Sequence, residues 1–136
     1  LLVGWSALRS DHLVAVAALY AGTVCWVIGY DTIYALQDRE DDALVGIRSS
    51  ALRLGTRVRG GVAVFYALAV TGWAAGFWLL RPDWVALLTL LPAALHLAWQ
   101  VGTLDPADPG NPLARFRANR LTGALVAAAC FVVGNA

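Results

Sequence analysis

The residues of this sequence that are best placed for chemistry are four aspartates and a tyrosine that follow an apolar run. On one helix, which turns about 100° per residue, their side chains would share an arc of about 100°. We call this set the acidic stripe, and it consists of Asp31, Tyr34, Asp38, Asp41 and Asp42. Like charges four residues apart destabilise a helix by about 0.2–0.5 kcal/mol, and carboxylates beside a membrane cost more. The stripe therefore predicts a positively charged partner.

Two partners could neutralise the acidic stripe: arginines from the segment that follows it, or a divalent cation. Several oxygen donors without His or Cys beside them suit a hard ion such as Mg²⁺, which binds through one or two carboxylates together with substrate phosphates. The alternative interpretation is an acidic helix end that is solvated among lipid headgroups and paired with neighbouring arginines. The spacing alone favours neither interpretation over the other.

The stripe must be carried by a membrane-spanning helix, because the chain has the composition of a membrane protein. It is 60% hydrophobic and 14% charged, with a mean hydropathy of +0.65, well outside the range of soluble domains. Stretches without any charged residue approach the roughly 20 residues that cross a bilayer as a helix. We expect a single transmembrane domain over residues 1–136, an all-α bundle with spans at about 12–37, 60–80, 84–104 and 120–136.

The arginines of the chain indicate how these spans are oriented. All ten basic residues are arginine, and most lie in or beside two expected loops, 38–59 and 105–119. They are Arg39, Arg48, Arg53, Arg57 and Arg59 around the first loop, and Arg115, Arg117 and Arg120 around the second. Because basic residues remain on the cytoplasmic side, both loops and the acidic stripe should face the cytoplasm. We expect an integral protein of a bacterial inner membrane.

Local signals refine the boundaries of these spans. Residues 105–112, DPADPGNP, contain three prolines, which cannot continue a helix, and we expect Asn119 to cap the last span. Residues 43–55 carry apolar residues at helical spacing with arginines between them, which favours a short helix at the membrane face. His96 lies within a span, where we expect it to be a hydrogen-bonded side chain. The opening LLVGWSAL looks like the end of another span, so we interpret the chain as a piece of a longer protein.

Two longer segments resemble a known family. The segment YDTIYALQDREDDALVGIRSSALRLG resembles the second aspartate-rich motif of the UbiA-type intramembrane prenyltransferases, most closely the branch that acts on 4-hydroxybenzoate in ubiquinone biosynthesis. The segment HLAWQVGTLDPADPGNPLARFRANRLTG resembles the end of that family, including a Phe-Arg-x-Asn element. The likeness covers nearly the whole chain as the family's C-terminal portion. The family's first aspartate-rich motif is absent, so we expect these residues to be inactive without the N-terminal half of the same protein.

The resemblance implies a fold, a reaction and roles for the acidic stripe. Family members are nine-span helical bundles whose central cavity opens toward the cytoplasm, and they transfer a prenyl group from a polyprenyl diphosphate to an aromatic acceptor. Two aspartate-rich motifs hold Mg²⁺ against the diphosphate. By motif position, Asp38 and Asp42 are the first expected metal ligands and catalytic residues, and Asp41 comes next. Asp31 and Tyr34 are expected to position the acceptor's hydroxyl or to take its proton.

The same resemblance gives a role to Arg48, which stands in the element GIRSS. Its guanidinium could face either the diphosphate or the carboxylate of a benzoate, and its fork could bind either group in a bidentate manner. Together with Tyr34 it is the expected substrate contact.

Two other functions remain open. One is prenyl transfer within the same family to another acceptor, such as a homogentisate, a naphthoate or haem. The other is a divalent-cation transporter or channel that uses the acidic stripe as its ion site. Transporters typically contain broken helices or internal repeats, and the sequence indicates neither.

Overall fold

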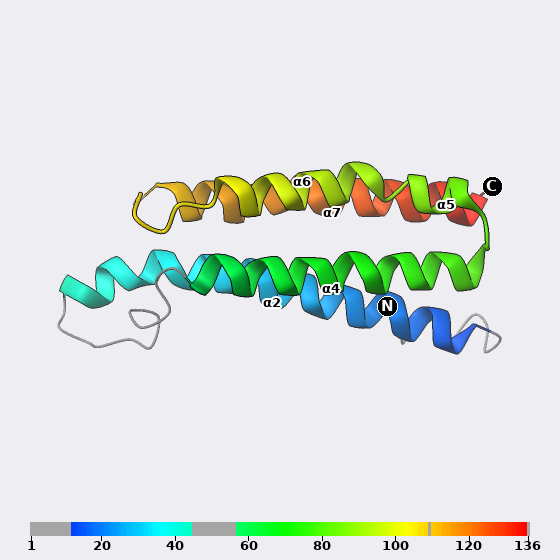
Figure 1. Ribbon diagram of the computed structural model, residues 1–136, viewed down its shortest axis with the longest axis horizontal. Helices are drawn as coiled ribbons and strands as arrows, with labels where there is room; N and C mark the ends of the chain where they lie inside the picture. Colours follow the sequence, from blue (N-terminus) through cyan, green and yellow to red (C-terminus); the bar gives the residue numbers. More distant parts are fainter. Residues whose placement is uncertain (1–11, 45–56, 109, 136) are drawn as a thin grey trace.

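The computed structural model describes residues 12–44, 57–108 and 110–135, and within 37–44 it describes the helix but not the side chains. The described part contains five helices. They are α2 (Leu13–Leu44), α4 (Arg57–Leu80), α5 (Trp84–Leu88), α6 (Leu91–Thr103) and α7 (Asn111–Asn135). Figure 1 shows two layers: α2 lies beside α4, and α5 and α6 lie beside α7.

The helices form four segments that are long and apolar enough to cross a membrane. These segments are Leu13–Leu36, Arg57–Leu80, Trp84–Thr103 and Asn111–Asn135. The prediction of an all-α transmembrane bundle is confirmed, and the chain is an integral membrane protein. The C-terminal end of α2 and the α6–α7 connection lie at the same end of this bundle, whereas the α4–α5 turn lies at the other end (Figure 1).

Helices α2 and α4 pack very closely because glycines line their contact. A Cβ added at Gly72 would lie 2.8 Å from the Cα of Gly22, and one added at Gly22 would lie 2.8 Å from the carbonyl oxygen of Ala69. A Cβ at Gly29 would likewise meet the ring of Tyr66 at 2.5 Å. Small residues at a helix contact are the usual way for membrane helices to approach one another. The α2–α4 pair therefore forms the tight side of the bundle.

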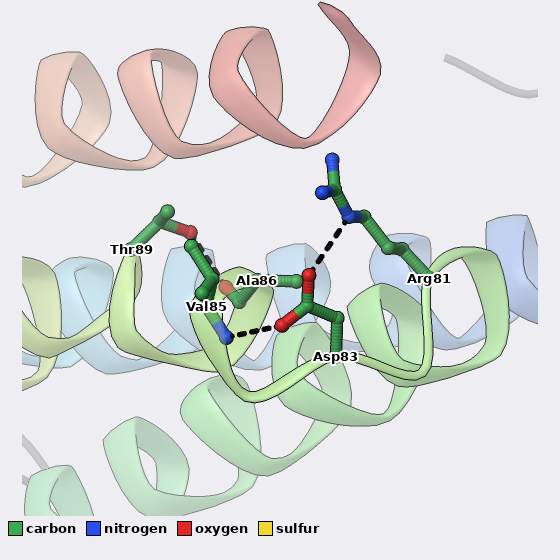
Figure 2. A network of polar contacts seen from close by, with 5 residues as sticks. All are labelled: Arg81, Asp83, Val85, Ala86 and Thr89. Atoms are coloured by element: carbon green, nitrogen blue, oxygen red, sulfur yellow. Dashed lines mark hydrogen bonds and ion pairs between the residues drawn. The ribbon is translucent and has the colours of Figure 1, made fainter. Parts of the chain in front are cut away.

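The third span is divided into two helices, which the sequence did not predict. The chain leaves α4 through a turn in which Arg81 Nε lies 3.2 Å from an Asp83 carboxylate oxygen, while Asp83 accepts a 2.7 Å hydrogen bond from the Val85 backbone N–H (Figure 2). Helix α5 ends after Leu88, and α6 begins at Leu91 with a proline in its first turn. Because Pro92 has no backbone N–H, it cannot donate to the carbonyl one turn earlier, and the span breaks there.

The last helix begins earlier than expected and corrects two expectations. Helix α7 starts at Asn111 instead of residue 120, so part of the expected loop 105–119 is helical. Pro112 lies in the first turn, where its missing N–H removes no intrahelical bond. The side chain of Asn111 closes the short connection: its Oδ1 accepts from the Asp105 N–H at 2.9 Å, and its Nδ2 donates to the Thr103 carbonyl at 3.0 Å. Asn119 lies inside α7, and its expected role as a cap was wrong.

Candidate functional site

The acidic stripe lies on one continuous helix. Helix α2 runs without interruption from Leu13 to Leu44. The unbroken helix that the stripe needs in order to share one face is therefore present. Asp31 is exposed and Tyr34 is 43% exposed, whereas Ile33 is fully buried in the core. The stripe therefore begins on a face of α2 that points away from the core.

Some expected site residues lie outside the part of the chain whose side chains are described. The side chains of Asp38, Asp41 and Asp42 belong to this group, as do Arg48 and most of the expected short helix at 43–55. Among the described residues, no three His, Cys, Asp or Glu side chains gather in a group that could hold a metal ion. The expected ligands of the acidic stripe remain a prediction.

An aromatic row connects the acidic stripe to α7. Trp26, Tyr30 and Tyr34 follow one another on α2 at four-residue spacing, and Asp38 is next in this series. The ring centroids of Trp26 and Tyr30 lie 5.3 Å apart, and Phe116 of α7 lies 5.8 Å from Tyr30 and 4.9 Å from Tyr34. The Phe-Arg-x-Asn element of α7 is thereby held against the helix that carries the stripe.

A cavity of about 360 Å³ lies at this contact. We call it the aromatic–arginine pocket, and it is lined by Trp26, Tyr30, Phe116, Arg117, Asn119 and Arg120. Arg117 and Arg120 are exposed, and neither has an ion pair or hydrogen bond with a residue in the described ranges. Arg115 differs from them, because its guanidinium carbon lies 4.2 Å from the ring centroid of Trp99 on α6. The pocket thus combines apolar rings with two positive charges.

One wall of the pocket is fixed by Asn119, which joins three other helices. The Trp26 indole N–H donates to Asn119 Oδ1 at 2.8 Å, and Asn119 Nδ2 donates to Gln100 Oε1 at 2.9 Å. The Tyr66 hydroxyl lies 3.3 Å from Asn119 Oδ1 and donates to Gln100 Oε1 at 3.2 Å. Gln100 is fully buried. Polar groups inside a membrane bundle must find partners within it, and here each helix layer supplies them.

The same polar network extends to His96. His96 Nδ1 lies 2.8 Å from the Thr122 hydroxyl, and Gln100 Nε2 donates to that hydroxyl at 3.1 Å. The expectation of a hydrogen-bonded histidine is confirmed. Sequence reasoning missed the network itself. Gln100 and Asn119 gave a signal that could have found it, because polar residues within apolar spans are rare and need partners there.

A second hollow lies between α4 and α6. We call it the α4–α6 groove; it has a volume of about 590 Å³ and small apolar residues dominate its lining. They include Ala63 and Ala67 of α4 and Ala94, Ala98 and Gly102 of α6. At the end of α6, Arg59 donates from Nε to the Val101 carbonyl at 2.7 Å and from Nη2 to the Gly102 carbonyl. Tyr66 also lines this groove, so the polar network touches both hollows.

The sequence of this chain matches a family model and curated relatives. The family model described as the UbiA prenyltransferase family matches residues 1–123. A 4-hydroxybenzoate polyprenyltransferase, mitochondrial, from Arabidopsis thaliana is 35% identical over 92% of this chain, and one from Homo sapiens is 37% identical over 92%. A 4-hydroxybenzoate solanesyltransferase from Synechocystis is 45% identical over 51% of the chain.

These relatives are much longer than the present chain. It spans 31% of the Arabidopsis protein, 34% of the human protein and 24% of the Synechocystis protein. The comparison with solved structures gave no match.

Proposed function

Because this chain belongs to the UbiA prenyltransferase family, we propose that the complete protein transfers a polyprenyl group from a polyprenyl diphosphate to the ring of 4-hydroxybenzoate in ubiquinone biosynthesis. The structural observation that carries this proposal is the continuity of α2 through Leu44. It supports a single helical face on which Asp31 and Tyr34 are followed by Asp38 and Asp42. The relatives that match 92% of the chain are named for transfer to this acceptor.

The reaction breaks the bond between the allylic carbon and the diphosphate oxygen and forms a bond from that carbon to the aromatic ring. The ring then loses a proton. We assign Asp38 and Asp42 first, and Asp41 next, as ligands of Mg²⁺, since a set made only of carboxylate oxygens fits a hard cation. Bound Mg²⁺ would neutralise the charge of the departing diphosphate.

The remaining residues of the stripe would act on the acceptor. Asp31 and Tyr34 lie about one to two turns before Asp38 on α2, on the side of the aromatic row. We assign them to hold the acceptor's hydroxyl or to take its proton. As the ring attacks, the hydroxyl oxygen becomes more positive and its proton more acidic. A carboxylate within hydrogen-bond reach can hold or accept that proton.

The test of this function is a transfer assay with the complete protein in membranes, labelled 4-hydroxybenzoate, a polyprenyl diphosphate and Mg²⁺. We expect Asp38→Ala and Asp42→Ala each to lower turnover by about 100-fold or more, because charge stabilisation of this kind is worth at least that much. Asp108→Ala is the matched control, since Asp108 is an exposed carboxylate of the α6–α7 connection. Unchanged turnover in the first two variants would show that the metal assignment is wrong. The present 136 residues alone should give no product.

We also propose a location. The arginine-rich connections support an orientation with the acidic stripe on the cytoplasmic side, and we assign the protein to a bacterial inner membrane. The relatives named mitochondrial make an organelle membrane the competing location. Cell fractionation followed by detection of the complete protein distinguishes the two.

A further inference from the structure

The aromatic–arginine pocket has a chemistry that the metal site does not explain. We propose that this pocket binds the aromatic acceptor as its carboxylate form, and that Arg117 and Arg120 determine specificity for that carboxylate. The inference rests on the proposed function, because it names the place where the acceptor of that reaction lies. It is carried by the charge of the pocket, its walls and its position along α2.

The charge of the pocket favours an anion. Arg117 and Arg120 are three residues apart, so they lie on neighbouring positions of one face of α7. The residues that line the cavity include no carboxylate, and the two guanidinium groups have no acidic partner within the described ranges. A guanidinium fork matches the two oxygens of a carboxylate. Two such forks at one cavity would select an acid over its neutral analogue.

The walls of the pocket favour a flat ring. Trp26, Tyr30 and Phe116 surround the cavity in edge-to-face contacts, with ring centroids 5.3 Å and 5.8 Å apart. Its volume of about 360 Å³ is near the lower end of small-molecule sites, which hold about 300–1,000 Å³. This size suits a single aromatic ring better than a long polyprenyl chain. Asn119 fixes Trp26 through its 2.8 Å hydrogen bond, so one wall is formed before the ligand arrives.

The position of the pocket matches the reaction. Four residues of helix rise about 6 Å, so Tyr34 lies about one turn from Tyr30 toward the acidic end of α2, and Asp38 lies one turn further. A 4-hydroxybenzoate whose carboxylate contacts Arg117 and Arg120 can direct its hydroxyl toward Tyr34. A hydroxyl activates the ring carbons beside it and the carbon opposite it. Because the carbon opposite carries the carboxylate, the new bond forms at a carbon beside the hydroxyl. That reacting carbon then faces the end of α2 where the diphosphate is proposed to lie.

This assignment separates two arginine roles that the sequence left open. Arg117 and Arg120 take the carboxylate of the acceptor, which leaves Arg48 for the diphosphate. The competing interpretation is that Arg117 and Arg120 only anchor the helix among lipid headgroups. An anchor would make no distinction between an acid and an amide acceptor, and the experiment uses this difference.

The experiment compares two acceptors in the complete protein: 4-hydroxybenzoate and 4-hydroxybenzamide, which keeps the ring and hydroxyl but has no negative charge. The measured quantity is the ratio of kcat/KM for the acid to that for the amide, in Arg117→Gln, Arg120→Gln and the double variant. A ratio within one variant does not depend on how much enzyme folds. We expect the double variant to lower the ratio by about 10- to 100-fold, the usual size of a lost charged hydrogen bond. KM for the polyprenyl diphosphate should change less than about twofold.

The control is Arg57→Gln, which removes an exposed arginine at the start of α4 and should leave the ratio unchanged. The proposal is overturned if the ratio in the double variant equals that of the wild type, including the case in which both acceptors lose the same factor. If the wild type transfers to neither acceptor, the proposed function fails. Equilibrium binding of labelled 4-hydroxybenzoate then decides on the pocket: binding that the double variant loses supports it, and no wild-type binding overturns it.

Discussion

The aromatic–arginine pocket and the α4–α6 groove lie between different helix pairs of the same bundle, and they differ in kind. The groove is larger, at about 590 Å³ against about 360 Å³, but alanines and other small residues dominate it. The pocket is smaller and carries rings, an amide and two guanidinium groups. Volume alone would select the groove as the functional site. The chemistry of the lining selects the pocket, which also adjoins the acidic stripe.

The polar network has residues in the lining of both hollows. Tyr66 lines the groove and Asn119 lines the pocket, and their side-chain oxygens lie 3.3 Å apart. A change in the network should therefore affect both hollows, whereas a change in one lining should affect only that hollow. The following substitutions use this difference.

The largest effect is expected from Asn119→Leu, which removes the network from the pocket side. The indole N–H of Trp26 would lose its acceptor, and Gln100 Oε1 would lose one of its two donors and keep the Tyr66 hydroxyl. An unsatisfied buried group costs about 1–3 kcal/mol. We expect a lower unfolding temperature in detergent and a loss of about 100-fold in kcat/KM for 4-hydroxybenzoate. Asn135→Leu, at the exposed end of the same helix, is the control. If the Asn119→Leu variant has the unfolding temperature and the kcat/KM of the wild type, the network contributes neither to stability nor to acceptor binding.

An intermediate effect is expected from Phe116→Ala, which removes one wall of the pocket. Its ring contacts both Tyr30 and Tyr34, and aromatic pairs contribute about 0.5–1.5 kcal/mol beyond their buried area. KM for 4-hydroxybenzoate should rise by about 10-fold, measured with saturating polyprenyl diphosphate. Phe131→Ala serves for comparison, because Phe131 is 70% exposed on the same helix. An equal KM in the two variants would contradict the assigned wall.

The smallest effect is expected from Ala98→Phe, which fills the α4–α6 groove. Ala98 is exposed, and substitutions away from packed or charged features usually change stability by less than about 0.5 kcal/mol. KM for 4-hydroxybenzoate and the acid-to-amide ratio should both stay within about twofold of the wild type. If this substitution raises KM for 4-hydroxybenzoate as much as Phe116→Ala does, the groove is part of the acceptor site, and the proposed difference between the two hollows is wrong.

The sequence predicted the features that depend on composition and on helical periodicity. Charge-free stretches indicated the spans, because about 20 apolar residues suffice to cross a bilayer. The spacing from Asp31 to Asp42 required only an unbroken helix, which α2 provides. The family followed from two motifs and agrees with the match over residues 1–123.

The sequence could not predict features that depend on distant contacts. Asn119 was interpreted from the proline-rich segment just before it, whereas its partners Gln100, Tyr66 and Trp26 lie 19, 53 and 93 residues away. The pocket exists only because α7 packs against α2, and no local pattern in either helix indicates this. The division of the third span also depended on the carbonyl that Pro92 leaves without a donor, which hydropathy does not detect.

Arg59 illustrates how one side chain can serve two purposes in a membrane helix bundle. It is one of the arginines from which we infer the orientation of the chain, and its fork donates to carbonyls in the last turn of α6, at Val101 and Gly102. Carbonyls in the last turn of a helix lack the usual intrahelical donor, and the Val101 carbonyl also accepts a 3.4 Å hydrogen bond from the Leu104 backbone N–H. A lysine would keep the positive charge but has no planar fork to span both oxygens. Arginine at this position therefore satisfies two carbonyls at an exposed helix end with one side chain.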